Sequence, residues 1–143
     1  MISTRHFDVS LTYADFHLLD QSASDGVLAP TAAADVGIFA ATTLGHGLLT
    51  GKDPRQIAEE YPGIHSADRV QHARKFWEFT QEKGVNLLAL NLHFCLRDSR
   101  RSAILMGSAN PAQIAADVRA LKSTIPDHVW DELSQWSGIV IGN

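Results

Sequence analysis

Two hydroxyls and two glycines follow a short apolar run near residue 40, a combination that can bind an anionic ligand. The segment Asp35 to Lys52 reads DVGIFAATTLGHGLLTGK. An apolar run of about six residues between turn residues predicts a fully buried strand of a parallel sheet, here Val36 to Ala41. Gly45 and Gly47 permit positive φ and let a ligand approach the backbone. An ordinary strand-to-loop connection is an equal alternative, because glycine-rich loops after strands are common.

A second loop of this kind is Gly107 to Gln113, GSANPAQ. It follows a predicted strand, Ala103 to Met106, and opens a helix with Asn110 as N-cap and Pro111 in the first position. The free N–H groups of a helix start can receive a phosphate. For this loop alone, a plain capped helix start is the favoured interpretation. Two such loops at the carboxyl edge of one parallel sheet would together favour a ligand site.

Other residue types that could perform chemistry lack a supporting pattern. His46 lies in the first glycine-rich loop, where a solvent-exposed histidine is the favoured interpretation. The seven histidines do not show the spacing of metal ligands. Cys95 lies in an apolar segment and is expected to be a small core residue, and Ser22 and Ser24 lack a nucleophile pattern. We therefore predict no catalytic residue and no metal site.

The elements that position the two loops follow from the hydrophobic pattern. The predicted strands are Phe7 to Tyr13, Val36 to Ala41 and Ala103 to Met106. The predicted helices are Ser22 to Ala34, Pro54 to Tyr61, a segment capped by Ser66 and ended by Gly84, Asn86 to Leu96, Ala112 to Leu121 and Pro126 to Trp136. Gly26 and Pro30 weaken the first helix. The alternation predicts parallel strands with right-handed crossovers.

Composition narrows the class of protein. The 143 residues are 45% hydrophobic and 20% charged, with a net charge of −4, which suits one domain with an apolar core. The mild acidity argues against a nucleic-acid partner, and no apolar run is long enough for a membrane span. The single cysteine excludes an internal disulfide and fits a cytoplasmic location.

Five segments resemble the C-terminal half of an aldo-keto reductase. In the branch that oxidises sugars such as L-galactose or L-fucose, the sixth strand and its loop resemble DVSLTYADFHLLDQS. The family motif SPLGxGLLTGK, after the seventh strand, resembles LGHGLLTGK, and VGASNPEQIEENV resembles ILMGSANPAQI. The helix pair before the eighth strand resembles ARKFWEFTQEKGVNLLALNLHFCL, and the C-terminal segment resembles IPDHVWDEL. The resemblance covers nearly the whole chain.

This resemblance implies an α/β fold, a partial (half) TIM (β/α) barrel of about three parallel strands with covering helices. It implies a single domain over residues 1–143, equivalent to the C-terminal half of the family barrel. It also implies an NADP(H)-binding surface. The residues that match the family's cofactor loops are Thr42, Leu44, Gly45, Gly47, Gly107, Ser108 and Gln113.

Departures from the family motifs lower the expected cofactor affinity. Thr43 replaces a proline, and Ala116 and Asp117 replace a Glu-Asn pair that touches the adenosine in the family. A carboxylate at Asp117 would repel a 2′-phosphate. The family's catalytic Asp, Tyr, Lys and His lie on its first four strands, to which nothing here corresponds. We therefore expect weak NADP(H) binding without catalysis by the chain alone.

Two alternatives remain open at this point. The chain can be the C-terminal part of a working reductase that a separate N-terminal half completes, or a structural or interaction module with no ligand. Three parallel strands leave two open edges and apolar residues such as Val9 and Phe39 uncovered, so a homodimer through a sheet edge or the barrel-interior face is expected. Alternatively, Met1 to Phe7 or the C-terminal Ser137 to Asn143 folds over an edge and leaves a monomer.

Overall fold

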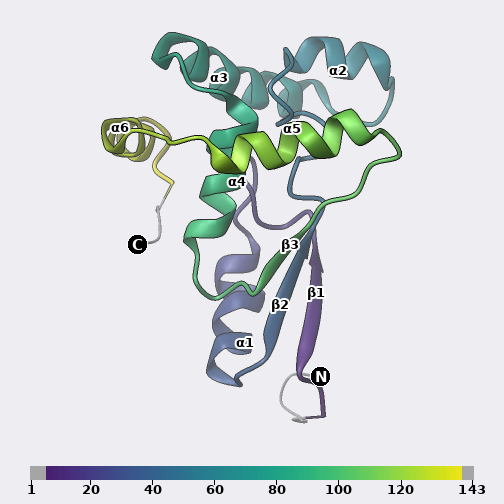
Figure 1. Cartoon of the computed structure of the whole chain (residues 1–143), viewed down its shortest axis with the longest axis vertical. Coiled ribbons are helices and arrows are strands. Elements are labelled where there is room, and N and C mark those ends of the chain that lie inside the picture. The colour runs from purple at the N-terminus through teal and green to yellow at the C-terminus, as the bar shows by residue number, and fades with distance from the viewer. Residues whose placement is uncertain (1–5, 140–143) are drawn as a thin grey trace.

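A computed structural model describes residues 6–139 of the chain. Its strands are β1 (Val9–Tyr13), β2 (Gly37–Ala41) and β3 (Ala103–Leu105). They form one parallel sheet in the order β1-β2-β3 (Figure 1). The expected fold class is confirmed: this is an α/β protein with a partial barrel sheet that does not close.

Helices gather on one side of the strands and beyond their carboxyl ends (Figure 1). Their bounds are η2 (Ser24–Leu28), α1 (Ala29–Ala33), α2 (Pro54–Glu60), α3 (Ala67–Lys83), α4 (Leu87–Arg97), α5 (Pro111–Lys122) and α6 (Asp127–Ser137). Among the described residues, no helix is long and apolar enough to cross a membrane. Every predicted helix except the first matches a single observed one to within two residues at each end.

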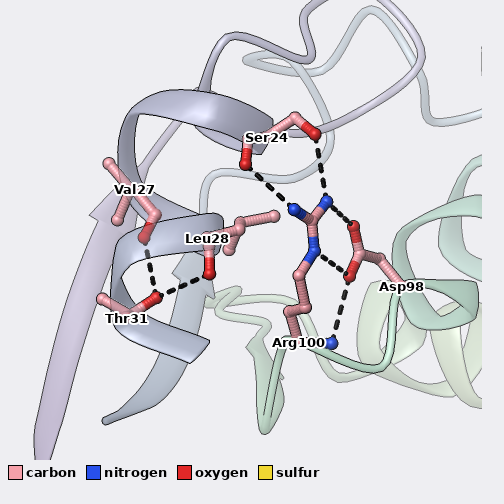
Figure 2. Close-up of polar contacts among 6 residues, drawn as sticks. All are labelled: Ser24, Val27, Leu28, Thr31, Asp98 and Arg100. Atoms are coloured by element: carbon pink, nitrogen blue, oxygen red, sulfur yellow. Dashed lines mark hydrogen bonds and ion pairs between the residues drawn. The ribbon is translucent and has the colours of Figure 1, made fainter. Parts of the chain in front are cut away.

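The first predicted helix, Ser22 to Ala34, is divided in the structure into the π-helical turn η2 and the short helix α1. Pro30 causes the division, because it lacks an N–H group and its ring crowds the preceding turn of a regular helix. The wider π turn accommodates this change. Below the junction, the Thr31 hydroxyl donates to the carbonyls of Val27 at 2.7 Å and Leu28 at 3.1 Å (Figure 2).

The predicted caps of the longer helices are also present. The Ser66 side chain accepts a hydrogen bond from Arg69 N–H at the start of α3, and Gly84 ends the helix in the left-handed conformation. The Asn86 side chain caps α4 through Ala89 N–H. The apolar helix α4 is buried as expected and forms the centre of the core. Its buried residues are Leu87, Leu88, Ala89, Leu90, Asn91, Leu92, Phe94 and Cys95.

The register shows which side chains share a face of the sheet. Leu11 lies beside Phe39, and Phe39 lies beside Ala103. On the opposite face, Ile38 is 0% exposed, whereas Phe39 is 37% exposed. The prediction that Val36 to Ala41 is buried on both faces is therefore wrong, because no helix of residues 6–139 covers the face that contains Phe39.

We call this uncovered surface the bare face. Its large apolar side chains are all at least 37% exposed. They are Val9, Leu11, Tyr13, Phe39 and Leu105. The two terminal segments proposed as edge covers fall mostly at residues 1–5 and 140–143, which lie outside the described residues.

A polar cluster joins the connection between α4 and β3 to the turn η2 (Figure 2). The Arg100 guanidinium donates to the Ser24 carbonyl and hydroxyl, each at 3.0 Å. The same guanidinium pairs with the Asp98 carboxylate at 2.6 and 2.9 Å. This pairing lowers the pKa of Asp98 below its usual value. The cluster fixes the start of β3 against a segment far away in the sequence.

Candidate functional site

The loops after β2 and β3 meet at the carboxyl edge of the sheet and enclose a groove of about 370 Å³. The β2–α2 loop and α2 form one wall, and the β3–α5 loop and α5 form the other. Ligands bind at this edge in open and closed parallel sheets. The groove is lined by Leu44, His46, Gly47, Thr50, Lys52, Ile57, Glu60, Tyr61, Leu88, Gly107, Ser108, Gln113, Ala116 and Asp117.

The β2–α2 loop contains an unusual run of left-handed residues. Gly45 and Gly47 have φ angles of 57° and 95°, which confirms that these glycines serve positive φ. Thr42 and His46 also have positive φ, at 57° and 55°. Such conformations cost non-glycine residues roughly 1–3 kcal/mol each and persist only where surrounding contacts hold them. Surrounding contacts must therefore hold the backbone of the β2–α2 loop in this conformation.

Buried polar side chains beneath the groove supply that constraint. The Asn91 amide donates to the Thr43 carbonyl at 2.9 Å, and its oxygen accepts from Leu18 N–H at 3.2 Å. Asn91 thus ties the loop after β2 to the loop after β1. The sequence analysis did not indicate this role, although a lone amide within the apolar run LLALNL is the signal that could have revealed it.

His17, in the loop after β1, is a second buried support. Its ring is 0% exposed, and Nδ1 accepts from Leu19 N–H at 3.1 Å. Nε2 lies 3.4 Å from a guanidinium nitrogen of Arg69. Burial, and secondarily the positive charge of Arg69, lowers the pKa of His17 to about 4. The imidazole is therefore neutral at physiological pH.

The β3–α5 loop is closed by its own side chains. Asn110 caps α5 by accepting from Ala112 N–H at 2.9 Å, and Pro111 occupies the first position, as predicted. The Ser108 hydroxyl accepts from Asn110 N–H at 3.0 Å and donates to the Gln113 side-chain oxygen. The first N–H groups of α5 are consequently engaged within the loop. The expectation that they are free to receive an anion is therefore wrong.

The seven residues expected to bind the cofactor fall into two groups. Five of them, Leu44, Gly47, Gly107, Ser108 and Gln113, line the groove together. Thr42 and Gly45 do not. Gly45 is turned into the core, where a Cβ would lie 3.4 Å from Leu19 and 3.5 Å from Leu49.

The two glycines that line the groove, Gly47 and Gly107, differ in the space around their backbone. A Cβ on Gly107 would meet nothing within 4 Å, so a ligand can approach this backbone. A Cβ on Gly47 would lie 3.3 Å from Ile57, and its φ of 95° strains other residues. Gly47 is required by the loop shape, whereas Gly107 leaves space.

Four groove residues from the segment around α2 were not indicated by the sequence analysis, namely Lys52, Ile57, Glu60 and Tyr61. Lys52 pairs with Glu60 at 3.2 Å, so the two charges offset each other on this wall. Tyr61, just after α2, is 56% exposed. Their place in the groove depends on how the short helix α2 folds back over its own loop, which no local motif records.

The remaining candidate nucleophiles and acids agree with the sequence interpretation in their burial. His46 is exposed, and its ring packs edge-on against Tyr13 with a centroid distance of 5.9 Å. Cys95 is 0% exposed, and burial raises the pKa of its thiol to about 11. Within residues 6–139, no group of three or more His, Cys, Asp or Glu side chains could hold a metal ion.

A parallel α/β sheet with a groove between two strand-end loops defines a partial barrel with a groove at its carboxyl edge. The family model described as aldo/keto reductase family matches residues 2–137. The chain belongs to the aldo/keto reductase family.

Characterised relatives are similar at low identity. D-threo-aldose 1-dehydrogenase of Pseudomonas sp is 24% identical over 128 residues, which are 90% of this chain and 39% of that protein. L-galactose dehydrogenase of Arabidopsis thaliana is 27% identical over 114 residues, 80% of this chain and 34% of the relative. L-glyceraldehyde 3-phosphate reductase of Escherichia coli is 27% identical over 124 residues, 71% and 36% of the two chains. The chain thus spans less than two fifths of the length of these relatives.

Proposed function

We propose that the chain binds NADP(H) weakly in the groove between the β2–α2 and β3–α5 loops. The observation that carries this proposal is the meeting of two glycine-containing loops at the ends of adjacent parallel strands. A groove of about 370 Å³ falls within the usual range for ligand sites. The residues that would contact the nucleotide are Leu44, Gly47, Gly107, Ser108 and Gln113, with Thr42 and Gly45 shaping the first loop.

The expected weakness has a structural reason. The Ala112 N–H at the start of α5 is bonded to Asn110, and Lys52 is offset by Glu60. A phosphate would have to displace these contacts to gain hydrogen bonds or charge.

We further propose that the isolated chain does not transfer hydride. The nicotinamide supplies the hydride chemistry when it is bound, whereas the protein must position a substrate and a proton donor beside it. General acid–base help alone is worth roughly 10²–10⁴-fold. No segment resembles the family's catalytic tetrad. A purified chain freed of contaminating reductases should show no NADP(H)-dependent reduction of aldehydes or oxidation of aldoses, and robust turnover would contradict this.

The bare face supports a proposal about assembly. Parallel sheets are normally covered on both faces, and an exposed apolar patch of this kind usually marks an interface. We propose that a second copy of the chain covers it, in a two-fold dimer.

We also propose a cytoplasmic location. The single cysteine of the sequence, Cys95, is a buried free thiol, as is usual for proteins of a reducing compartment.

A second candidate follows from the share of the relatives that the chain covers. The remaining three fifths or more of each relative could be supplied here by a separate polypeptide that packs on the bare face and completes a reductase. A neighbouring reading frame encoding such a segment would favour this candidate over the dimer.

Fluorescence titration with NADPH tests the nucleotide site. The wild type should bind weakly, and Gly47→Val and Gln113→Ala should each lower the affinity further. Gly63→Val is the matched control, because Gly63 also has positive φ, at 83°, but lies outside the groove. Equal affinity of the wild type and both groove variants, or no binding to any of them, would favour a module without a ligand.

A further inference from the structure

Asp117 is the acidic residue on the α5 wall of the groove. It is only 8% exposed. In the part of the chain that the structure describes, no hydrogen bond or ion pair engages its carboxyl, and burial raises the pKa of Asp117 above its usual value. A buried polar group without a partner is costly, so a ligand that supplies a partner to this carboxyl gains free energy.

The charged residues around the groove leave Asp117 without a counter-charge. Lys52, on the opposite wall, pairs with Glu60 at 3.2 Å, so these two charges offset each other. The cations of α5 itself, Arg119 and Lys122, do not line the groove. With histidines counted as neutral, ionised Asp117 therefore leaves the groove with an uncompensated negative charge.

The groove also offers a largely apolar lining. Apolar side chains come to it from three helices and from the β2–α2 loop, namely Ala116 of α5, Leu88 of α4, Ile57 of α2 and Leu44 of the loop. Tyr61, just after α2, adds an exposed aromatic side chain. Such a lining favours a ligand with an organic body, because apolar surface gains free energy when it leaves water.

We propose that the groove binds an organic amine, with the ammonium group of the ligand on the Asp117 carboxylate and its apolar part against the groove lining. A charged N–H donor satisfies a carboxylate better than a neutral donor does, because charge-assisted hydrogen bonds are shorter and stronger. An ammonium is also attracted to the face of an aromatic ring such as that of Tyr61. This inference goes beyond the proposed nucleotide site and does not depend on it, although the two ligands would compete for the same groove.

A divalent metal ion does not match this site. Such ions require several oxygen ligands, whereas the α5 wall offers the single carboxyl of Asp117. Within residues 6–139, no group of three or more His, Cys, Asp or Glu side chains could hold a metal ion. An amine matches both the single charge and the apolar lining.

A chemical-shift titration of the full chain with benzylammonium tests the proposal, because this probe joins an ammonium group to an aromatic ring. The backbone amides of Gln113 and Asp117 should shift along a common saturating curve. Asp117→Asn should weaken binding about tenfold, because it removes the charge but keeps the shape. Asp131→Asn, an equal charge change at an exposed position of α6, should bind as the wild type does. Unchanged affinity in Asp117→Asn, or an equal loss in Asp131→Asn, overturns the proposal.

Neutral and anionic analogues of the probe give a test that needs no variant. Benzyl alcohol should bind the wild type about tenfold more weakly than benzylammonium, and benzoate more weakly still. Carbon-13 NMR should show that the pKa of Asp117 falls when benzylammonium binds, because a nearby positive charge favours the carboxylate. Equal affinity for the alcohol and the ammonium, or an unchanged pKa, overturns the proposal.

A parallel titration with NADPH separates this inference from the proposed function. If benzylammonium binds and NADPH does not, the proposed nucleotide site fails and the amine site stands. If NADPH binds and benzylammonium does not, the amine site alone fails. If both bind, each should displace the other from the groove, and simultaneous binding would overturn the placement of the amine.

Discussion

Both faces of the three-stranded sheet carry apolar side chains, but the two faces differ in what covers them. On one face, Ile38 and Ala40 are 0% and 2% exposed beneath the helices. On the other, Leu11 and Phe39 are 57% and 37% exposed. Neighbouring residues of a strand point to opposite faces, so β2 places apolar side chains on both faces of the sheet. The helices of the described residues cover only one of these faces.

The comparison predicts very different effects for adjacent residues of β2. Ile38→Ala should lower the free energy of unfolding by about 2–5 kcal/mol, because it leaves a cavity in the covered core. Phe39→Ala should cost the monomer less than about 1 kcal/mol, because its side chain is already in contact with water. Urea unfolding at low protein concentration measures both. Equal losses would mean that something covers Phe39 even in the monomer.

Acid should lower the stability of the protein through His17, which is buried in the loop after β1. The pKa of His17 is about 4 when folded and 6.5 in its reference state, so between these pH values the unfolded chain binds a proton that the native chain does not. Stability should therefore fall as pH drops from about 6.5 to about 4, by ~3 kcal/mol in total, with no further loss from this group below pH 4.

Unfolding curves across this pH range check the prediction, with His17→Asn as the variant that cannot titrate. The exposed His128→Asn on α6 is the control. If His17→Asn does not fold, proton NMR of the wild-type ring gives its pKa directly. A value near 6.5 would remove His17 as the cause.

Self-association should depend on the bare face. Leu11→Asp places a charge among apolar side chains and should weaken dimerisation about tenfold or more. Sedimentation at micromolar concentration should give twice the chain mass of 15.6 kDa for the wild type and a monomer for the variant. Ile64→Asp is the control, because Ile64 is 61% exposed away from the sheet. A wild-type monomer at every concentration would reject the dimer.

The smallest effect concerns a hydroxyl on the covered side. Thr12 is 6% exposed, and its Oγ1 is buried without a hydrogen-bond partner within residues 6–139. Thr12→Val should therefore raise the free energy of unfolding by about 1 kcal/mol. Thr31→Val is the matched control and should lower stability by a similar amount, because the Thr31 hydroxyl donates to two carbonyls. A loss in Thr12→Val would indicate an ordered water on that hydroxyl.

The helices were predictable from the sequence where the residues that begin them act on their own neighbours in the chain. Ser66, Asn86 and Asn110 each cap a helix through their own side chain, and such caps act within three residues of the chain. The bare face was also foreseeable from the small number of strands. The division at Pro30 was not, because the proline signals a break without specifying how the backbone accommodates it.

The candidate site was predictable only along its two loops. Gly47, Ser108 and Gln113 belong to motifs and line the groove, although whether they bind a cofactor stays a prediction. Asn91 escaped the sequence analysis, because its contacts with Thr43 and Leu18 join segments 48 and 73 residues apart. Lys52 escaped it because its pairing with Glu60, eight residues away, depends on how α2 folds back over its own loop. In a hydrophobic pattern, a buried amide such as Asn91 only interrupts the apolar run of its helix, so the pattern does not reveal its hydrogen-bonding role.

The contact of Arg100 with Ser24 has a consequence for the order of folding. It joins positions 76 residues apart, and everything from β2 to α4 lies between them. Closing a loop of that length costs conformational entropy before any contact compensates for it, and such long-range contacts slow folding. We therefore expect β3 to join the sheet after the intervening helices have formed. We expect β3, the strand that completes the groove, to dock last, so that the groove is the latest part of the molecule to form.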